Sequence, residues 1–173
     1  REFMTASAAT GIIGAVAPAA QAFTLPDPAQ KARLRLSCQE GVSAGKTLAE
    51  KLDFLEANGF EGLEVGGRDL AKRVEELQKA LEGRKIKLSA VCAGFEGVLI
   101  SEQEEVRQKA LRSMKEILTA AGALGSTGMI MVPAFHNQTK LGHQESRELL
   151  IKLLAELGDH AHKAGTRVLL DPL

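Results

Sequence analysis

The feature that most constrains the fold is a repeated unit, in which a short apolar segment is followed by a longer segment with apolar residues at helical spacing. The predicted strands cover residues 33–38, 62–66, 86–92, 129–132 and 166–170. The predicted helices between them cover residues 47–59, 69–82, 101–121 and 144–164. Strands that alternate with helices over short connections predict a parallel sheet with helices outside it.

Local signals define the ends of several of these elements. Thr47 with Glu50, and Ser101 with Glu104, have the spacing of a capping box, which predicts a helix start at each place. Gly59, Gly83 and Gly165 follow the first, second and fourth helices, as expected for helix ends. In the first strand, Leu34 and Leu36 are predicted to share one face.

The sequence favours a closed barrel over a doubly wound sheet. No glycine-rich dinucleotide fingerprint follows the first predicted strand, where residues 37–41 read Ser-Cys-Gln-Glu-Gly. A complete eight-unit barrel typically needs about 250 residues, whereas this chain has 173. The predicted fold is therefore α/β, a partial (β/α)8 TIM barrel over residues 33–173 with the first five strands and four helices. Because an unpaired fifth strand favours aggregation, we expect the natural product to be longer.

The first 32 residues are predicted to lie outside this domain. Residues 1–22 have a charged start, a weakly apolar run and a small-residue cleavage site, which is typical of an export signal. Arg1 and Phe3 resemble the end of a twin-arginine motif; an ordinary apolar helix or a Sec signal are the alternatives. Residues 23–32 would form a tether. We expect a periplasmic or secreted protein, exported by the twin-arginine route and free of the membrane after cleavage.

The charge balance argues against nucleic acid as a partner. Lysine plus arginine and aspartate plus glutamate both number 22, so the chain lacks the net positive charge of a nucleic-acid binder. Cys38 and Cys92 are too few for a disulfide framework and fall on non-neighbouring predicted strands. We expect both to be small buried residues.

Polar residues occur where the predicted strands end, and the carboxyl ends of barrel strands carry the chemistry of this fold. They include Glu40, Glu64, His136 and Asp171. Glu64 interrupts a buried strand, and alternation turns it toward the barrel axis; an internal ion pair, for example with Arg68, is the alternative. His136 suits a ligand hydrogen bond or a metal, although a loop histidine is often simply solvated.

Asp171 follows three apolar residues and precedes Pro172, which restricts the backbone just after the strand. A carboxylate at this place can bind a divalent cation, which stabilises an enediolate when a proton leaves the carbon beside a carbonyl. The alternative is a helix cap for a following segment.

Two segments carry a resemblance to a known family. Gly62-Leu63-Glu64-Val65-Gly66 at the second strand and Leu170-Asp171-Pro172-Leu173 at the fifth resemble the sugar phosphate isomerase/epimerase family of xylose isomerase-like TIM barrels. The resemblance spans residues 34–173. It implies a divalent metal (Mn, Mg or Co) held by a glutamate at the fifth strand, a role that falls here on the shorter Asp171. The family's other ligands would lie beyond Leu173, so we expect this fragment to be inactive alone.

The resemblance implies an isomerase or epimerase that abstracts a proton next to the carbonyl of a sugar or sugar-like hydroxy-carbonyl compound. Asp171 and Glu64 would be catalytic, with Asp171 also a metal ligand. Predicted substrate-binding residues are Glu40, Phe95, Phe135 and His136. A lyase or phosphodiesterase of the same superfamily, and an exported non-catalytic sugar-binding barrel, are the alternatives. Association into a homo-oligomer stays open.

Overall fold

The computed structural model of the chain describes residues 33–135 and 137–171. The described residues from Leu34 onward cluster as one compact unit. The predicted export signal (residues 1–22), the tether (residues 23–32) and His136 lie outside the described residues, so the expectations about them stay predictions. Within the described residues, no helix is long and apolar enough to cross a membrane.

Strands and helices alternate along the described chain. The strands are β1 (Ser37–Gln39), β2 (Gly62–Gly66), β3 (Lys87–Cys92), β4 (Met129–Met131) and β5 (Val168–Leu170). The helices are α1 (Leu48–Ala57), α2 (Leu70–Leu81), α3 (Glu104–Ala123) and α4 (His143–Lys163). The strands pair in parallel in the order β1-β2-β3-β4-β5. Sequential order without a switch point is the barrel arrangement, which confirms the predicted partial barrel.

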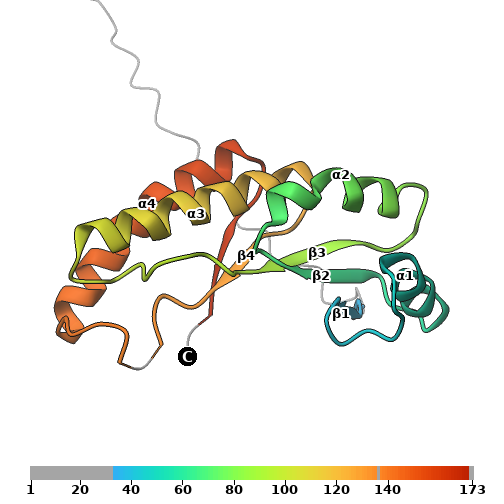
Figure 1. Cartoon of the computed structure of the whole chain (residues 1–173), viewed down its shortest axis with the longest axis horizontal. Coiled ribbons are helices and arrows are strands. Elements are labelled where there is room, and N and C mark those ends of the chain that lie inside the picture. Colours follow the sequence, from blue (N-terminus) through green and yellow to red (C-terminus); the bar gives the residue numbers. More distant parts are fainter. Residues whose placement is uncertain (1–32, 136, 172–173) are drawn as a thin grey trace, which may run out of the picture. The chain divides into compact units, whose positions relative to one another are not determined.

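The apolar core lies between the sheet and its helices. Helices α2, α3 and α4 run along one side of the sheet (Figure 1). The buried residues on the sheet side are Leu63, Val65, Leu88, Val91, Met129 and Met131. The helices contribute Leu77, Leu111, Met114, Leu118, Leu153 and Leu157, among others. Since strand residues alternate in direction, the residues between the buried ones point to the opposite, inner face of the sheet.

Only one of the two predicted capping boxes forms. At α1, the Glu50 N–H donates to Thr47 Oγ1 at 3.2 Å, and the Thr47 N–H donates to Glu50 Oε2 at 3.0 Å. The prediction at Ser101 is wrong, because α3 begins at Glu104 with Gln103 as its N-cap. The Ser101 hydroxyl is buried and accepts the Gln103 N–H at 3.2 Å, so it closes a turn before the helix.

The first strand is shorter and lies later than residues 33–38. Leu34 and Leu36 are 88% and 52% exposed, so they do not form the predicted buried face. The neighbouring strand explains the shift: β2 starts at Gly62, whose register partner is Ser37. The Leu36 carbonyl accepts the Gly62 N–H at 3.0 Å, and Ser37 is the first residue of β1 with a register partner. Because β1 extends to Gln39, this side chain shares the inner face with Ser37, and Glu40 belongs to the helix-covered face.

Small residues lie on the inner face at the amino ends of the first three strands. Ser37 Oγ and Ser89 Oγ are 2.6 Å apart and hydrogen-bond across β2, above Gly62. Ser89 Oγ also donates to the Leu63 carbonyl at 3.0 Å. The register of β3 against β2 shifts between Leu63 and Glu64, and Ser89 is the extra residue there.

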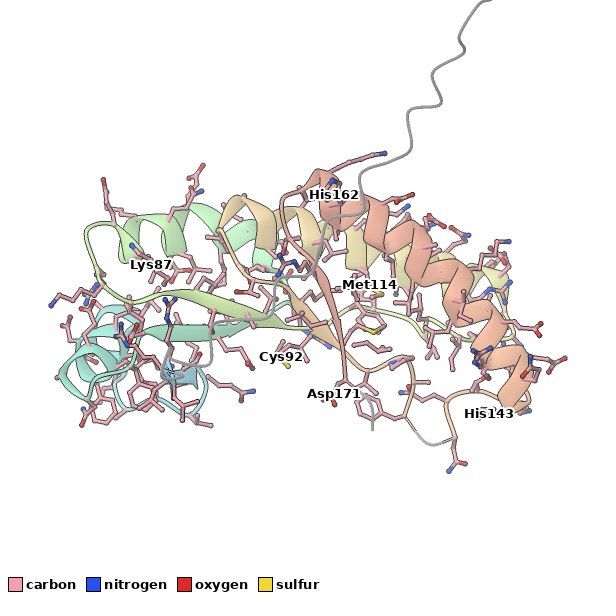
Figure 2. The ribbon with its side chains drawn as sticks, turned by 180° about the vertical axis from the view of Figure 1, so that it is seen from behind. Lys87, Cys92, Met114, His143, His162 and Asp171 are labelled. Atoms are coloured by element: carbon pink, nitrogen blue, oxygen red, sulfur yellow. The ribbon has the colours of Figure 1, made fainter. Side chains whose placement is uncertain are left out.

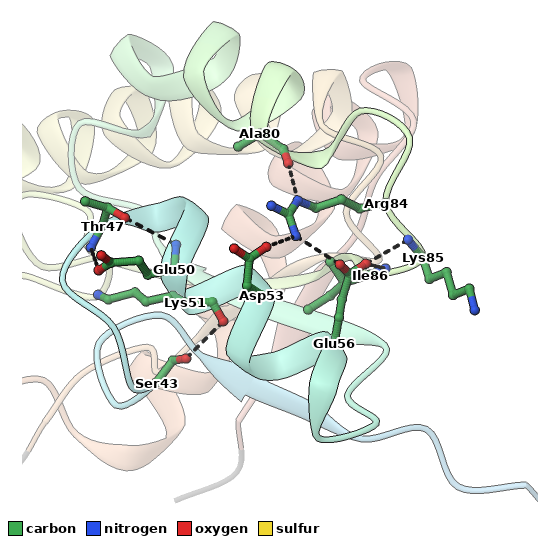
Figure 3. Close-up of polar contacts among 10 residues, drawn as sticks. All are labelled: Ser43, Thr47, Glu50, Lys51, Asp53, Glu56, Ala80, Arg84, Lys85 and Ile86. Atoms are coloured by element: carbon green, nitrogen blue, oxygen red, sulfur yellow. Dashed lines mark hydrogen bonds and ion pairs between the residues drawn. The ribbon is translucent and has the colours of Figure 1, made fainter.

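An ion-pair network ties α1 to the connection between α2 and β3 (Figure 3). The Arg84 guanidinium contacts Asp53 at 2.7 Å and Glu56 at 2.9 Å, and its Nε donates to the Ala80 carbonyl at 3.0 Å. The Glu56 carboxylate also accepts the N–H groups of residues 85 and 86, at 2.9 and 3.2 Å. These hydrogen bonds, led by the one from Ile86, hold the pKa of Glu56 below its ordinary value.

Both cysteines are free and lie on non-neighbouring strands, as predicted. The expectation that both are buried is wrong for Cys92, whose side chain is exposed on the inner face at the end of β3. Cys38 is half-buried and packs against the core.

Candidate active site

A cavity of about 260 Å³ opens at the carboxyl ends of β3, β4 and β5. The segments after β3 and β4 form most of its wall, and the residue after β5 completes it. Cys92 and Asp171 both line it, and in Figure 2 they lie near each other at one end of the strands, whereas Lys87 lies at the other end of β3. Carboxyl ends of parallel strands are where barrels place their reactive groups.

Asp171 sits directly after β5. Its N–H donates to the Met131 carbonyl at 3.0 Å, which continues the ladder by one residue and fixes the backbone there. The residue is half-buried, and its carboxylate has no ion-pair partner in the part of the chain that the structure describes. A carboxylate with open coordination at the cavity wall fits the predicted role of a cation ligand.

Two phenylalanines that the sequence predicts to bind substrate line the same cavity. Phe95 follows β3 and is partly buried against the core, whereas Phe135 follows β4 and is 60% exposed. The Phe135 N–H donates to Gln138 Oε1 at 2.9 Å, and the Gln138 N–H donates back to the Phe135 carbonyl at 3.1 Å. Asn137 completes this turn with a positive φ of 67°.

Glu64 points to the inner face, in the orientation predicted from alternation. Leu63 and Val65 on either side are fully buried, while Glu64 is half-buried. Its Oε1 accepts a hydrogen bond of 2.6 Å from Gln39 Nε2. The alternative of an ion pair with Arg68 does not occur among the described residues; Arg68 instead lines a separate cavity beside α3.

The Glu64 carboxylate affects the pKa of Cys92, a residue of the cavity wall. Packing around the sulfur raises the pKa of the Cys92 thiol, and the nearby Glu64 carboxylate raises it further. Cys92 therefore lies near Glu64 and also lines the cavity that Asp171 lines.

The structure does not bring Glu40 to this group of side chains. Its carboxylate is turned to the helix-covered side, where Arg73 of α2 donates two hydrogen bonds to it, at 3.0 and 2.9 Å. Such a bidentate pair occupies both oxygens. Glu40 therefore anchors the segment after β1 to α2 and does not join the other predicted site residues.

Sequence reasoning placed Gln39 at the end of the first strand but gave it no role, and it missed Cys92 and Gln138. Gln39 lies directly before the predicted Glu40, and the choice between them depends on where β1 ends. Glu64 was the residue that could have pointed to Gln39, because the parallel register pairs the two and puts both side chains on one face. Gln138 had no pattern that distinguished it from any other polar loop residue.

Within the described residues, no group of three histidine, cysteine, aspartate or glutamate side chains could hold a metal ion. Asp171 would supply one oxygen ligand, and other ligands would have to come from outside the described residues. His160 on α4 contacts the Thr119 hydroxyl at 2.9 Å and the Lys115 carbonyl at 3.0 Å, so it packs against α3 away from the cavity.

A parallel sheet in sequential order, with helices on one side and a cavity at the carboxyl strand ends, defines the (β/α)-barrel class of proteins. A family model described as "Xylose isomerase-like TIM barrel" matches residues 52–173. The chain belongs to this family.

Known relatives share this fold. The chain is 26% identical over 148 residues to 3-dehydro-D-guloside 4-epimerase of Escherichia coli (strain K12), a match that covers 81% of this chain and 56% of the relative. The chain thus spans a little over half the length of that relative.

Solved structures give the same picture. The apo structure of 3-keto-D-glucoside 4-epimerase from E. coli superposes with a TM-score of 0.72 at 24% identity, over 82% of this chain and 57% of that one. D-psicose 3-epimerase with D-tagatose from Clostridium cellulolyticum H10 gives 0.69 at 16% identity, over 81% and 53%. The IOLI protein, solved with a zinc atom, gives 0.65 at 20% identity, over 79% and 51%. These likenesses show the fold.

Proposed function

We propose that the protein carrying this chain is an isomerase or epimerase of a sugar or sugar-like hydroxy-carbonyl compound. The observation that carries the proposal is the cavity at the carboxyl strand ends, where the open carboxylate of Asp171 faces a wall containing Phe95 and Phe135. Membership in the xylose isomerase-like family and the sugar epimerases among its relatives support this reaction class.

Each side chain has a role in the proposal. The two phenylalanine rings cover the apolar C–H face of the sugar and exclude water from it. Asp171 binds the divalent metal together with ligands outside the described residues, and the bound metal would stabilise negative charge on the substrate oxygens. Glu64 contacts the substrate from the opposite part of the inner face. His136, outside the described residues, follows Phe135 and is proposed as a further substrate contact.

Hydrogen exchange tests the reaction class without knowledge of the product. Proton abstraction beside a carbonyl, followed by return of a proton from solvent, incorporates deuterium when the reaction runs in D2O. We expect the complete natural protein, supplied with Mn²⁺, to deuterate at least one of D-fructose, D-psicose, D-tagatose or a 3-keto-D-glucoside, measured by proton NMR. Asp171→Ala should remove the exchange. Exchange that persists in this variant would contradict the role of Asp171, and no exchange with any of these sugars would contradict the reaction class.

A second candidate function follows from one observation, the aspartate at a position where the resemblance implies a glutamate. A shorter carboxylate favours a sugar-binding protein without turnover. The variant Asp171→Glu separates the two. A large gain in deuterium incorporation supports a weakened enzyme, whereas sugar binding without exchange in either form supports a binder.

A further inference from the structure

Gln39 and Glu64 form an amide–carboxylate pair on the inner face of β1 and β2. The two residues are register partners in the parallel ladder, and Gln39 Nε2 donates to Glu64 Oε1 at 2.6 Å. Gln39 is exposed and Glu64 is half-buried, so the pair faces open space. The hydrogen bond joins the two side chains across the ladder.

The pair keeps unused hydrogen-bonding capacity. A carboxylate can accept about four hydrogen bonds, and a primary amide has two N–H donors and one carbonyl acceptor. Within the described residues, Gln39 is the hydrogen-bond partner of the Glu64 side chain, and no ion pair involves it. The second oxygen of Glu64 and the second N–H of Gln39 thus remain available, side by side.

Among the described residues, the neighbouring side chains do not supply partners for these atoms. The hydroxyls of Ser37 and Ser89, toward the amino ends of the strands, are engaged with each other and with the Leu63 carbonyl. On the side of β3, Cys92 lines the cavity that Asp171 also lines, and the nearby Glu64 carboxylate raises the pKa of its thiol. The free donor and acceptor therefore lie on the inner face near Cys92, which itself lines the cavity at the carboxyl ends of β3, β4 and β5.

We propose that Gln39 and Glu64 bind two adjacent hydroxyl groups of the sugar, with Gln39 acting as a positioning residue for Glu64. One hydroxyl donates to the free oxygen of Glu64, and its neighbour accepts the free N–H of Gln39. Adjacent hydroxyls distinguish a polyol from other carbonyl compounds, so the pair selects for sugars. The inference rests on the proposed function only in taking the ligand to be a sugar.

Protection of Cys92 from alkylation measures binding without turnover. In a Cys38→Ser background, the rate of reaction of Cys92 with iodoacetamide is followed against the concentration of D-fructose, D-psicose or D-tagatose, and then of their monodeoxy derivatives. We expect at least one of the three sugars to protect the thiol. Gln39→Met, which keeps the side-chain length and removes both polar atoms, should weaken that sugar's binding about ten-fold.

The deoxy derivatives separate a contact from a general structural effect. One monodeoxy sugar should bind equally to the native protein and to Gln39→Met, because it lacks the hydroxyl that Gln39 binds. Gln78→Met on α2 is the matched control: it removes an amide that donates to the Ala123 carbonyl at 3.0 Å, outside the site, and should leave protection unchanged. The proposal is overturned if no sugar protects Cys92, or if Gln39→Met weakens every deoxy derivative equally.

Deuterium exchange keeps this inference distinguishable from the proposed function. Protection that depends on Gln39, without exchange in any sugar, supports the pair and contradicts the isomerase. Exchange in which Gln39→Met leaves both KM and kcat at native values contradicts the pair and leaves the isomerase standing. A rise in KM with little change in kcat is the expected result, because the hydroxyls contacted by the pair do not react.

Discussion

The hydroxyl oxygens of Ser37 and Ser89 are 2.6 Å apart although β2 separates their strands. They meet because Gly62 between them has no side chain. A Cβ at Gly62 would lie 2.9 Å from Ser37 Cβ, Ser37 Oγ and Ser89 Cβ. The absence of a side chain at Gly62 thus allows β1 and β3 to hydrogen-bond to each other across β2.

Gly62→Ala should therefore destabilise the fold. The added methyl group would force β1 and β3 apart and break the serine hydrogen bond, at a cost of about 1–3 kcal/mol in the free energy of unfolding. Gly66→Ala on the same strand is the control, because a Cβ there meets nothing within 4 Å. Urea unfolding would measure both. Equal midpoints for the two variants would refute the steric account.

A second steric prediction concerns the contact between α3 and α4. A Cβ at Gly122 would lie 1.9 Å from the carbonyl oxygen of Ala164, so Gly122→Ala should push α4 away and cost at least about 2 kcal/mol. Gly158 on α4 faces open space, and Gly158→Ala should stabilise by about 0.5–1 kcal/mol through helix propensity. Thermal unfolding should show shifts of opposite sign, and a shared sign would contradict the prediction.

Glu56 gives a prediction for acid stability. Its pKa is lowered in the folded state, chiefly by the hydrogen bond from the Ile86 N–H, so its contribution is present above the unfolded-state pKa. This contribution is lost as the pH falls through the lower, folded-state value. Glu56→Gln should reduce stability at pH 7 by about 1 kcal/mol and flatten its loss at acid pH.

The matched control for that experiment is Glu75→Gln. Glu75 is exposed on α2 and should change neither the stability nor its pH profile. Urea midpoints between pH 3 and pH 7 would decide the matter. A native-like acid profile in Glu56→Gln would show that this carboxylate does not stabilise the connection between α2 and β3.

The rate at which Cys92 is alkylated should depend on the charge of Glu64. Burial and the Glu64 carboxylate both raise the pKa of its thiol, so Glu64→Gln removes the second cause and leaves the first. The thiolate fraction at neutral pH should rise, and alkylation by iodoacetamide in a Cys38→Ser background should become several-fold faster. Glu96→Gln, which removes a carboxylate paired with Lys109 at 2.9 Å, should leave the rate unchanged. An unchanged rate in Glu64→Gln would place its charge away from the cavity.

The alternation of strands and helices could be predicted from the sequence because both depend on local periodicity. Leu63, Val65 and Leu77 follow that periodicity and are buried as the patterns require. The inward orientation of Glu64 follows from the same rule. The spacing of apolar residues within one element is enough to predict its type and its buried face, whatever its neighbours are.

The start of β1 and the role of Glu40 depend on neighbours distant in sequence. Residues 34 and 36 look like strand residues, but the partner strand begins only opposite Ser37. The end of β1 then decides which of two adjacent polar residues faces the inner side. Arg73, which binds Glu40 from α2, lies 33 positions along the chain, so no local pattern connects them.

The division of labour between Gln39 and Glu40 matters for protein engineering. Consecutive residues belong here to different faces of the sheet, since the Gln39 amide binds Glu64 on the inner face and the Glu40 carboxylate binds Arg73 on the helix-covered face. Library mutagenesis at position 39 would vary ligand preference with the scaffold intact. Insertion of a single residue into β1 would exchange the two faces and damage both at once.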